Sequence, residues 1–134
     1  MYAADGEYGR LAGAGPHLVK RARAVARGFL RVLVPGGGVE AESVLLVVSE
    51  LVTNAVRHAG GMTGFGLRAG PGTVAVTVED ASCEVPRAGV SKPDGTGGFG
   101  WSVVQDLAQE VQVRTHPQGK AVTAVLALPH VLPL

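Results

Sequence analysis

Apolar residues recur with helical spacing in two stretches of the first half of the chain. The first stretch predicts a helix that Pro16 can open and that Pro35-Gly36-Gly37-Gly38 ends. The second predicts a helix from about Glu40 to Ala59, with Gly60-Gly61 as a plausible C-terminal cap. Two amphipathic helices in succession are therefore expected before the middle of the chain.

The period then changes from helical to alternating. Apolar residues alternate with others over 65–67 and 74–78, on either side of Gly70-Pro71-Gly72, and this pattern predicts a β-hairpin. Residues 80–96 follow as a loop that is too long for a simple connection, and loops of that length are often functional.

The rest of the chain predicts a third helix and a second hairpin. The helix runs from Gly100 to about Glu110, and the hairpin pairs 111–115 with 121–128. The order α, α, β, β, loop, α, β, β favours the α+β class. We expect a two-layer α/β sandwich with the helices on one face of a mixed, mainly antiparallel sheet.

Length and composition indicate one domain. The chain has 134 residues, of which 46% are hydrophobic and only 4% aromatic, so the core must consist mostly of Val, Leu and Ala. Residues 1–15, with four glycines, are expected to form a flexible N-terminal tail, and 16–134 a single domain.

Charge and cysteine usage exclude several classes of function. The net charge is +1 and no basic run exceeds two residues, which argues against direct nucleic-acid or membrane binding. Cys83 is the only cysteine and the histidines lack metal-ligand spacing, so neither a disulfide framework nor a zinc site is expected. The first ten residues lack the apolar segment of a signal peptide, and a cytoplasmic location is expected.

The second helix carries an unusual polar side. Glu50, Asn54, Arg57 and His58 lie opposite the apolar residues, although Asn is a poor residue for the middle of a helix. A carboxylate one turn before a carboxamide offers a proton acceptor beside a neutral ligand for a metal ion or water. Phosphate chemistry with a divalent cation can use that pair.

Residues 95–100 read GTGGFG and directly precede the third helix. A dinucleotide-binding fold is excluded, because no strand comes directly before the glycines and no acidic residue follows at the required distance. Backbone N–H groups at the start of a helix suit an anion such as phosphate. A flexible glycine linker before an ordinary helix remains the alternative.

Asp80 lies where the apolar strand 74–78 ends. A carboxylate at that place can accept a hydrogen bond from the exocyclic amine of adenine. The alternative is an aspartate that only forms the turn at the end of the strand.

Together these three elements resemble the Bergerat-fold ATP-binding family, which includes gyrase, large heat-shock chaperones, histidine kinases and mismatch-repair ATPases. The chain is more similar to the small anti-sigma-factor serine kinases and their actinobacterial relatives. The resemblance covers about residues 17–129 and is carried by the segments SELVTNAVRHA, VEDAS and GGFGWSVV.

The resemblance implies a role for each matching residue. Asn54 would ligate the Mg²⁺ that bridges the phosphates of ATP, and Glu50 would act as the general base. Asp80 would bind the adenine amine, with Ser82 in the place of the first glycine of the family's usual D-x-G-x-G segment. The remaining nucleotide-binding positions would be Gly95, Gly97, Gly98 and Gly100, at the end of the lid, and Thr123, which matches the family's pocket threonine.

The implied function is an ATP-dependent protein serine/threonine kinase that phosphorylates a small antagonist protein and sequesters a sigma factor, with a homodimer as a further family expectation. Two alternatives stay open. The chain can be a nucleotide-sensing module that binds a partner without transferring phosphate. It can also be an interaction domain without ATP, which the lack of glycines directly after Asp80 favours.

Overall fold

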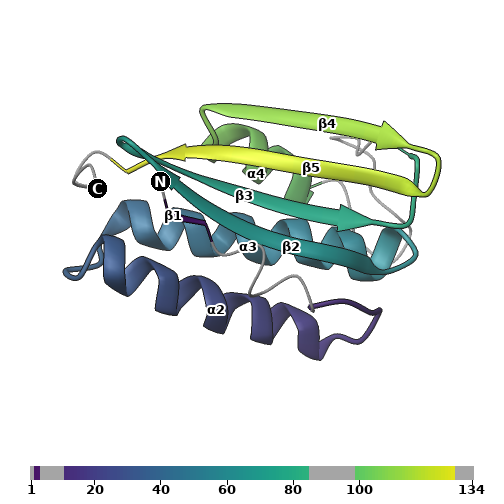
Figure 1. Ribbon diagram of the computed structural model, residues 1–134, viewed down its shortest axis with the longest axis horizontal. Helices are drawn as coiled ribbons and strands as arrows, with labels where there is room; N and C mark the ends of the chain where they lie inside the picture. Colours follow the sequence, from purple (N-terminus) through teal and green to yellow (C-terminus); the bar gives the residue numbers. More distant parts are fainter. Residues whose placement is uncertain (1, 4–10, 85–98, 129–134) are drawn as a thin grey trace.

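The computed structural model describes residues 2–3, 11–84 and 99–128. Its long helices and strands follow each other in the expected order (Figure 1). In chain order the elements are β1 (Tyr2–Ala3), α2 (His17–Leu33), α3 (Val39–His58), β2 (Met62–Gly70), β3 (Thr73–Asp80), α4 (Phe99–Leu107), β4 (Glu110–His116) and β5 (Gly119–Ala127).

The strands form one sheet in the order β1-β2-β3-β5-β4. β2 and β3 form the first hairpin and β4 and β5 the second, with β5 lying between β3 and β4. Every pair of neighbouring strands in the described chain is antiparallel, so the expectation of a mixed sheet is wrong in this detail. Short turns close both hairpins, and a short turn permits only antiparallel pairing.

Three helices cover one face of this sheet, which confirms the two-layer sandwich. α3 lies along the sheet, and α2 and α4 both pack against α3 (Figure 1). Side chains of β3 alternate between buried and partly exposed, as expected for a sheet with one covered face.

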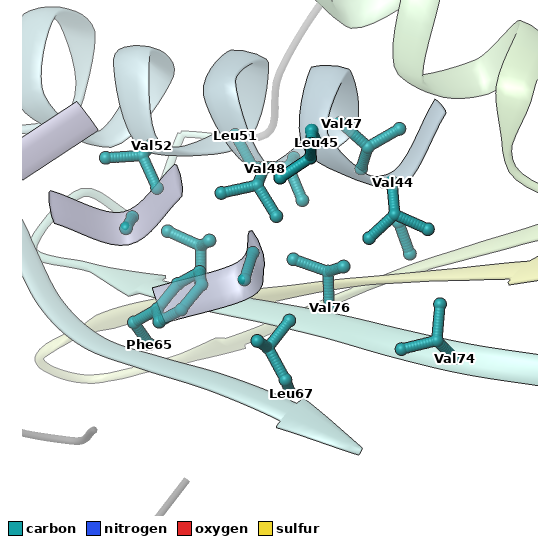
Figure 2. Close-up of a cluster of buried hydrophobic side chains, with 14 of the residues drawn as sticks. Val44, Leu45, Val47, Val48, Leu51, Val52, Phe65, Leu67, Val74 and Val76 are labelled. Atoms are coloured by element: carbon teal, nitrogen blue, oxygen red, sulfur yellow. The ribbon is translucent and has the colours of Figure 1, made fainter. Parts of the chain in front are cut away.

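The core lies between α3 and the strands. Figure 2 shows the valines and leucines of α3 pointing toward side chains of β2 and β3. Val44, Val48 and Val76 are all 0% exposed. The labelled core residues are Val44, Leu45, Val47, Val48, Leu51, Val52, Phe65, Leu67, Val74 and Val76. Aliphatic side chains thus dominate the core, as the low aromatic content predicts.

The described residues before α2 are docked on the domain. Tyr2 and Ala3 pair with β2, and Leu11 is only 4% exposed. Gly13 and Met62 donate backbone hydrogen bonds to each other, each 2.8 Å long. These contacts satisfy backbone groups at the edge of the sheet, which the glycine-rich sequence gave no reason to expect.

The C-terminal end of α3 is fixed against the end of β3. Gly60 has a φ of 75°, and the N–H of Gly61 donates to the Ala55 carbonyl at 2.9 Å. The Gly61 carbonyl in turn accepts the N–H of Ala81 at 3.3 Å. The expected glycine cap therefore also holds the residue that follows Asp80.

None of the described helices is both long enough and apolar enough to cross a lipid bilayer.

Candidate functional site

Glu50 and Asn54 lie one turn apart on the side of α3 that turns toward α4. Both side chains are half-buried, whereas the following Arg57 is exposed. Asn54 follows Glu50 by four positions, which corresponds to about 6 Å along the helix axis. The apolar stripe of α3 is used for the core, so this polar pair remains at the border between α3 and α4.

The Glu50 carboxylate contacts the start of α4. A Cβ atom added to Gly100 would overlap Oε2 of Glu50 and would lie 3.2 Å from its Cδ. Gly100 belongs to the first turn of α4, where backbone N–H groups have no partner within the helix. The structure therefore brings together a carboxylate and a helix start that the sequence places 50 residues apart.

The donor set around Asn54 suits Mg²⁺. Among the described residues, no group of three or more His, Cys, Asp or Glu side chains can hold a metal ion without help. Mg²⁺ commonly takes only one or two protein ligands and completes its octahedron with phosphate oxygens and water. A half-buried carboxamide oxygen next to a carboxylate fits that chemistry.

Asp80 is buried at the end of β3, with 4% of its surface exposed. Its Oδ1 accepts the backbone N–H of Ser82 at 2.9 Å, so Asp80 does form a turn at the strand end. The same oxygen accepts a hydrogen bond from Nζ of Lys120 at 3.0 Å. Asp80 is therefore both a turn residue and half of a buried ion pair.

Ser82 lies beside this pair. Its carbonyl accepts a second hydrogen bond from Lys120 Nζ at 3.3 Å, and its hydroxyl accepts the N–H of Glu84 at 3.0 Å. The serine that replaces the family's glycine thus fixes the segment after β3 through its backbone and its side chain.

Asp80 faces the helices, as Glu50 and Asn54 face α4. It continues the buried positions Val76 and Val78 of β3, which face the core. Ala81 contacts the end of α3 at Gly60, where an added Cβ would lie 3.6 Å from the Ala81 Cβ. The three candidate residues therefore lie on the same side of the sheet, Glu50 and Asn54 on α3 and Asp80 at the end of β3.

Thr123 does not join this group. It occupies a half-exposed position of β5 between the buried Val122 and Ala124, so its side chain lies on the opposite face of the sheet. There its hydroxyl is 2.9 Å from that of Thr77, and both line a groove of about 440 Å³. The match to the family's pocket threonine is therefore not supported by the position of Thr123.

Gly95, Gly97 and Gly98 lie outside the described residues, and of the predicted lid glycines only Gly100 is described. Trp101, which follows it, is 7% exposed and belongs to the core, as expected for a lone aromatic residue.

Lys120 is the site residue that the sequence reasoning missed. It lies directly across from Asp80 in the pairing of β3 with β5, and it is 3% exposed. Within β5 it shares a face with Val122, Ala124 and Leu126. A lysine in an otherwise apolar alternation signals a buried partner, since a buried charge needs one. That signal was present in the sequence.

Solved structures of similar fold include the RsbU and RsbW domains of Rv1364c from Mycobacterium tuberculosis. The TM-score is 0.63 at 19% identity, over 96% of this chain and 33% of the other. This chain thus spans about a third of that solved chain. The catalytic domain of the histidine kinase ThkA matches with a TM-score of 0.52 at 14% identity, over 87% of this chain and 94% of the other. At these identities the matches show the fold.

No curated protein matches the chain. A family model does: that of the histidine kinase-like ATPase domain, which matches residues 13–126. The matched range contains α2 to α4, the first hairpin, the second hairpin up to Leu126, and all the candidate residues discussed above. The protein therefore belongs to the histidine kinase-like ATPase domain family, whose members are ATP-binding domains of the GHKL type.

Proposed function

We propose that the protein is an ATP-dependent protein serine/threonine kinase of the anti-sigma-factor type. The observation that carries this proposal is the contact between the Glu50 carboxylate and Gly100, with Asn54 one turn further along α3. A carboxylate that can accept a proton then lies close to a carboxamide that can bind a metal ion, and both lie close to the start of α4. Asp80 lies on the same side of the sheet, where it can meet the base of the nucleotide.

Asn54 would hold Mg²⁺ through its side-chain oxygen, together with phosphate oxygens of ATP. When bound, the ion would neutralise charge on the phosphates. The half-burial of Asn54 supports this role, because a partly shielded ligand loses less of its interaction energy to water.

Glu50 would accept the proton of the attacking hydroxyl. The hydroxyl oxygen of a serine or threonine would form a bond to the γ-phosphorus, and the bond from the γ-phosphorus to the bridging oxygen would break, releasing ADP. The proton would pass to the Glu50 carboxylate. Backbone N–H groups in the first turn of α4, beside Gly100, would stabilise the phosphoryl charge.

The proposal includes the partners that the sequence resemblance implies: a small antagonist protein as phosphate acceptor, a sigma factor as the sequestered protein, and a homodimer of this chain. It is supported by the segment SELVTNAVRHA, which carries Glu50 and Asn54, and by the fold shared with a chain that contains an RsbW domain.

A transfer assay tests the kinase. The chain would be incubated with Mg²⁺, γ-labelled ATP and candidate antagonist proteins, and label on serine or threonine of one of them is expected. Glu50→Gln should retain ATP affinity and lose most of the transfer, by about 10²-fold or more. Glu42→Gln, at an exposed position of the same helix, is the matched control and should behave as the wild type. Undiminished transfer by Glu50→Gln would remove Glu50 from the role of base.

A nucleotide-sensing module without transfer is the second candidate. The buried pair of Asp80 and Lys120 favours it, because the carboxylate that would read the base already has a charged partner. In that case ATP would bind and change the affinity for a partner protein, while no candidate antagonist would become labelled.

A further inference from the structure

A buried ion pair lies at the base-binding end of the proposed nucleotide site. The Asp80 and Lys120 side chains are 5% and 4% exposed, and Nζ of Lys120 is 3.0 Å from Oδ1 of Asp80. Two buried charges must satisfy each other or find polar partners, since their desolvation is costly. The Lys120 ammonium therefore lies beside the carboxylate that is proposed to bind the base.

The pair is held in a fixed place by the sheet. Asp80 and Lys120 are direct partners across β3 and β5. The neighbouring Gly119 has a φ of 152° and packs so tightly that an added Cβ would overlap the Asp80 carbonyl oxygen. This close contact fixes the backbone of β5 against the end of β3, and with it the point from which the Lys120 side chain extends.

Both partners retain hydrogen-bonding capacity. An ammonium group has three N–H bonds, and Lys120 directs two of them to Asp80 Oδ1 and the Ser82 carbonyl. Asp80 accepts the Lys120 and Ser82 bonds on Oδ1, and Oδ2 accepts neither of them. A donor and an acceptor thus stand next to each other.

A lone carboxylate and a carboxylate–ammonium pair distinguish purines differently. Adenine presents a donor at its 6-amino group, which a carboxylate accepts, whereas guanine and hypoxanthine present the acceptor O6. A lone carboxylate and O6 are both hydrogen-bond acceptors, so a site with only the carboxylate would reject a 6-oxopurine. An adjacent ammonium removes that conflict, because it donates to O6 while the carboxylate accepts the N1–H.

We propose that Lys120 determines base specificity, and that the Asp80–Lys120 pair lets the site take guanine and hypoxanthine nucleoside triphosphates as well as ATP. With adenine, Asp80 accepts from the 6-amino group and Lys120 donates to N7, and a 6-oxopurine binds one position further along its edge, so that the order of the two partners stays the same. With a 6-oxopurine, Lys120 donates to O6 and Asp80 accepts from N1–H. This inference rests on the proposed position of the nucleotide base at Asp80.

Calorimetric titration of the full chain with ATP, GTP and ITP in the presence of Mg²⁺ tests it. The affinities for GTP and ITP are expected within about tenfold of that for ATP. ITP isolates the 6-position, because hypoxanthine has O6 but lacks the 2-amino group of guanine. A loss of about 100-fold or more for both 6-oxopurines, the size of one charged hydrogen bond left unmade, would overturn the proposal.

Lys120→Met removes the donor at nearly constant side-chain length. We expect the affinities for GTP and ITP to fall about 10- to 100-fold relative to that for ATP. Lys20→Met, at an exposed position of α2, is the matched control and should keep the wild-type ratios. Unchanged ratios in a folded Lys120→Met would overturn the proposal. If that variant does not fold, by circular dichroism, the wild-type ratios alone decide.

The outcomes separate this inference from the proposed kinase. The affinity ratios of GTP and ITP to ATP can depend on Lys120 while no antagonist protein becomes labelled. That result would support the inference on base specificity and exclude the kinase. If ATP labels an antagonist protein and the chain does not bind GTP or ITP, the kinase is supported and the inference on base specificity is excluded. A wild-type chain that binds none of the three nucleotides would overturn both.

Discussion

The carboxylate of Glu50 lies against the α-carbon of Gly100, so closely that a Cβ atom there would displace it. Glu50 comes from the middle of α3 and Gly100 from the first turn of α4. The contact joins the two helices that would supply the proton acceptor and the anion-binding N–H groups. Glycine at this position thus lets the Glu50 carboxylate take this place beside the start of α4.

Gly100→Ala is expected to displace the Glu50 carboxylate. Its Cβ would overlap Oε2, which is the end of a flexible, half-buried side chain and can move aside, so stability should change by no more than about 1 kcal/mol. Phosphoryl transfer should fall at least about tenfold, because the base is misplaced. Urea unfolding and the labelled-ATP assay measure the two effects.

Gly28→Ala is the matched control for Gly100→Ala. Gly28 lies inside α2 with nothing within 4 Å of an added Cβ, so alanine should stabilise the protein by about 0.5–1 kcal/mol and leave transfer unchanged. Equal transfer by the two variants would show that the Glu50–Gly100 contact has no consequence for phosphoryl transfer.

The Asp80–Lys120 pair should show strong energetic coupling. Removing one partner leaves a buried charge uncompensated, so Lys120→Met and Asp80→Leu are each expected to cost about 3–5 kcal/mol of unfolding free energy. The double variant should lose far less than the sum, with a coupling of at least about 2 kcal/mol in a double-mutant cycle. Additive losses in urea unfolding would contradict a tight buried pair.

Thr123→Val is expected to leave the affinity for ATP unchanged. The side chain faces away from the helices and bonds to Thr77, so its loss should cost only about 1 kcal/mol of stability. Calorimetry with ATP and Mg²⁺ measures the affinity. A loss of tenfold or more would place Thr123 in the nucleotide site after all and would contradict the register of β5.

Asn54→Ala should weaken the binding of ATP in the presence of Mg²⁺ by about tenfold or more, because a metal ligand is lost. Without Mg²⁺ the variant and the wild type should bind ATP alike. Thr53→Ala, one residue away and on a different side of α3, is the control and should keep the wild-type affinity. An Asn54→Ala variant with wild-type Mg-ATP affinity would exclude Asn54 as the ligand.

The sequence predicted the helices and hairpins because each has a clear period and a clear end. Gly60-Gly61 follows the end of α3, and the turn between β2 and β3 lies within the expected segment, at Pro71-Gly72. The polar side of α3 was also visible, since an Asn in the middle of a helix is unfavourable. Each of these features depends on residues close together in the sequence, so the order of polar, apolar and glycine residues is enough to predict it.

The register between strands that lie far apart in the sequence was harder to predict. Whether Lys120 or Thr123 shares a face with Asp80 depends on the register of β5 against β3, and a shift by one residue would exchange their faces. The family resemblance suggested Thr123, whereas the alternation of Val122 and Ala124 with their neighbours places Lys120 beside Asp80. The docking of Gly13 on Met62 likewise rests on backbone hydrogen bonds that no side-chain pattern encodes.

The central claim is that α3 provides one wall of a Mg-ATP site through Glu50 and Asn54. Calorimetric titration of the wild-type chain with ATP, once with Mg²⁺ and once with EDTA, tests it most directly. We expect one site per chain whose affinity falls at least about tenfold when Mg²⁺ is removed. Absence of binding, or equal affinity with Mg²⁺ and with EDTA, would contradict the account.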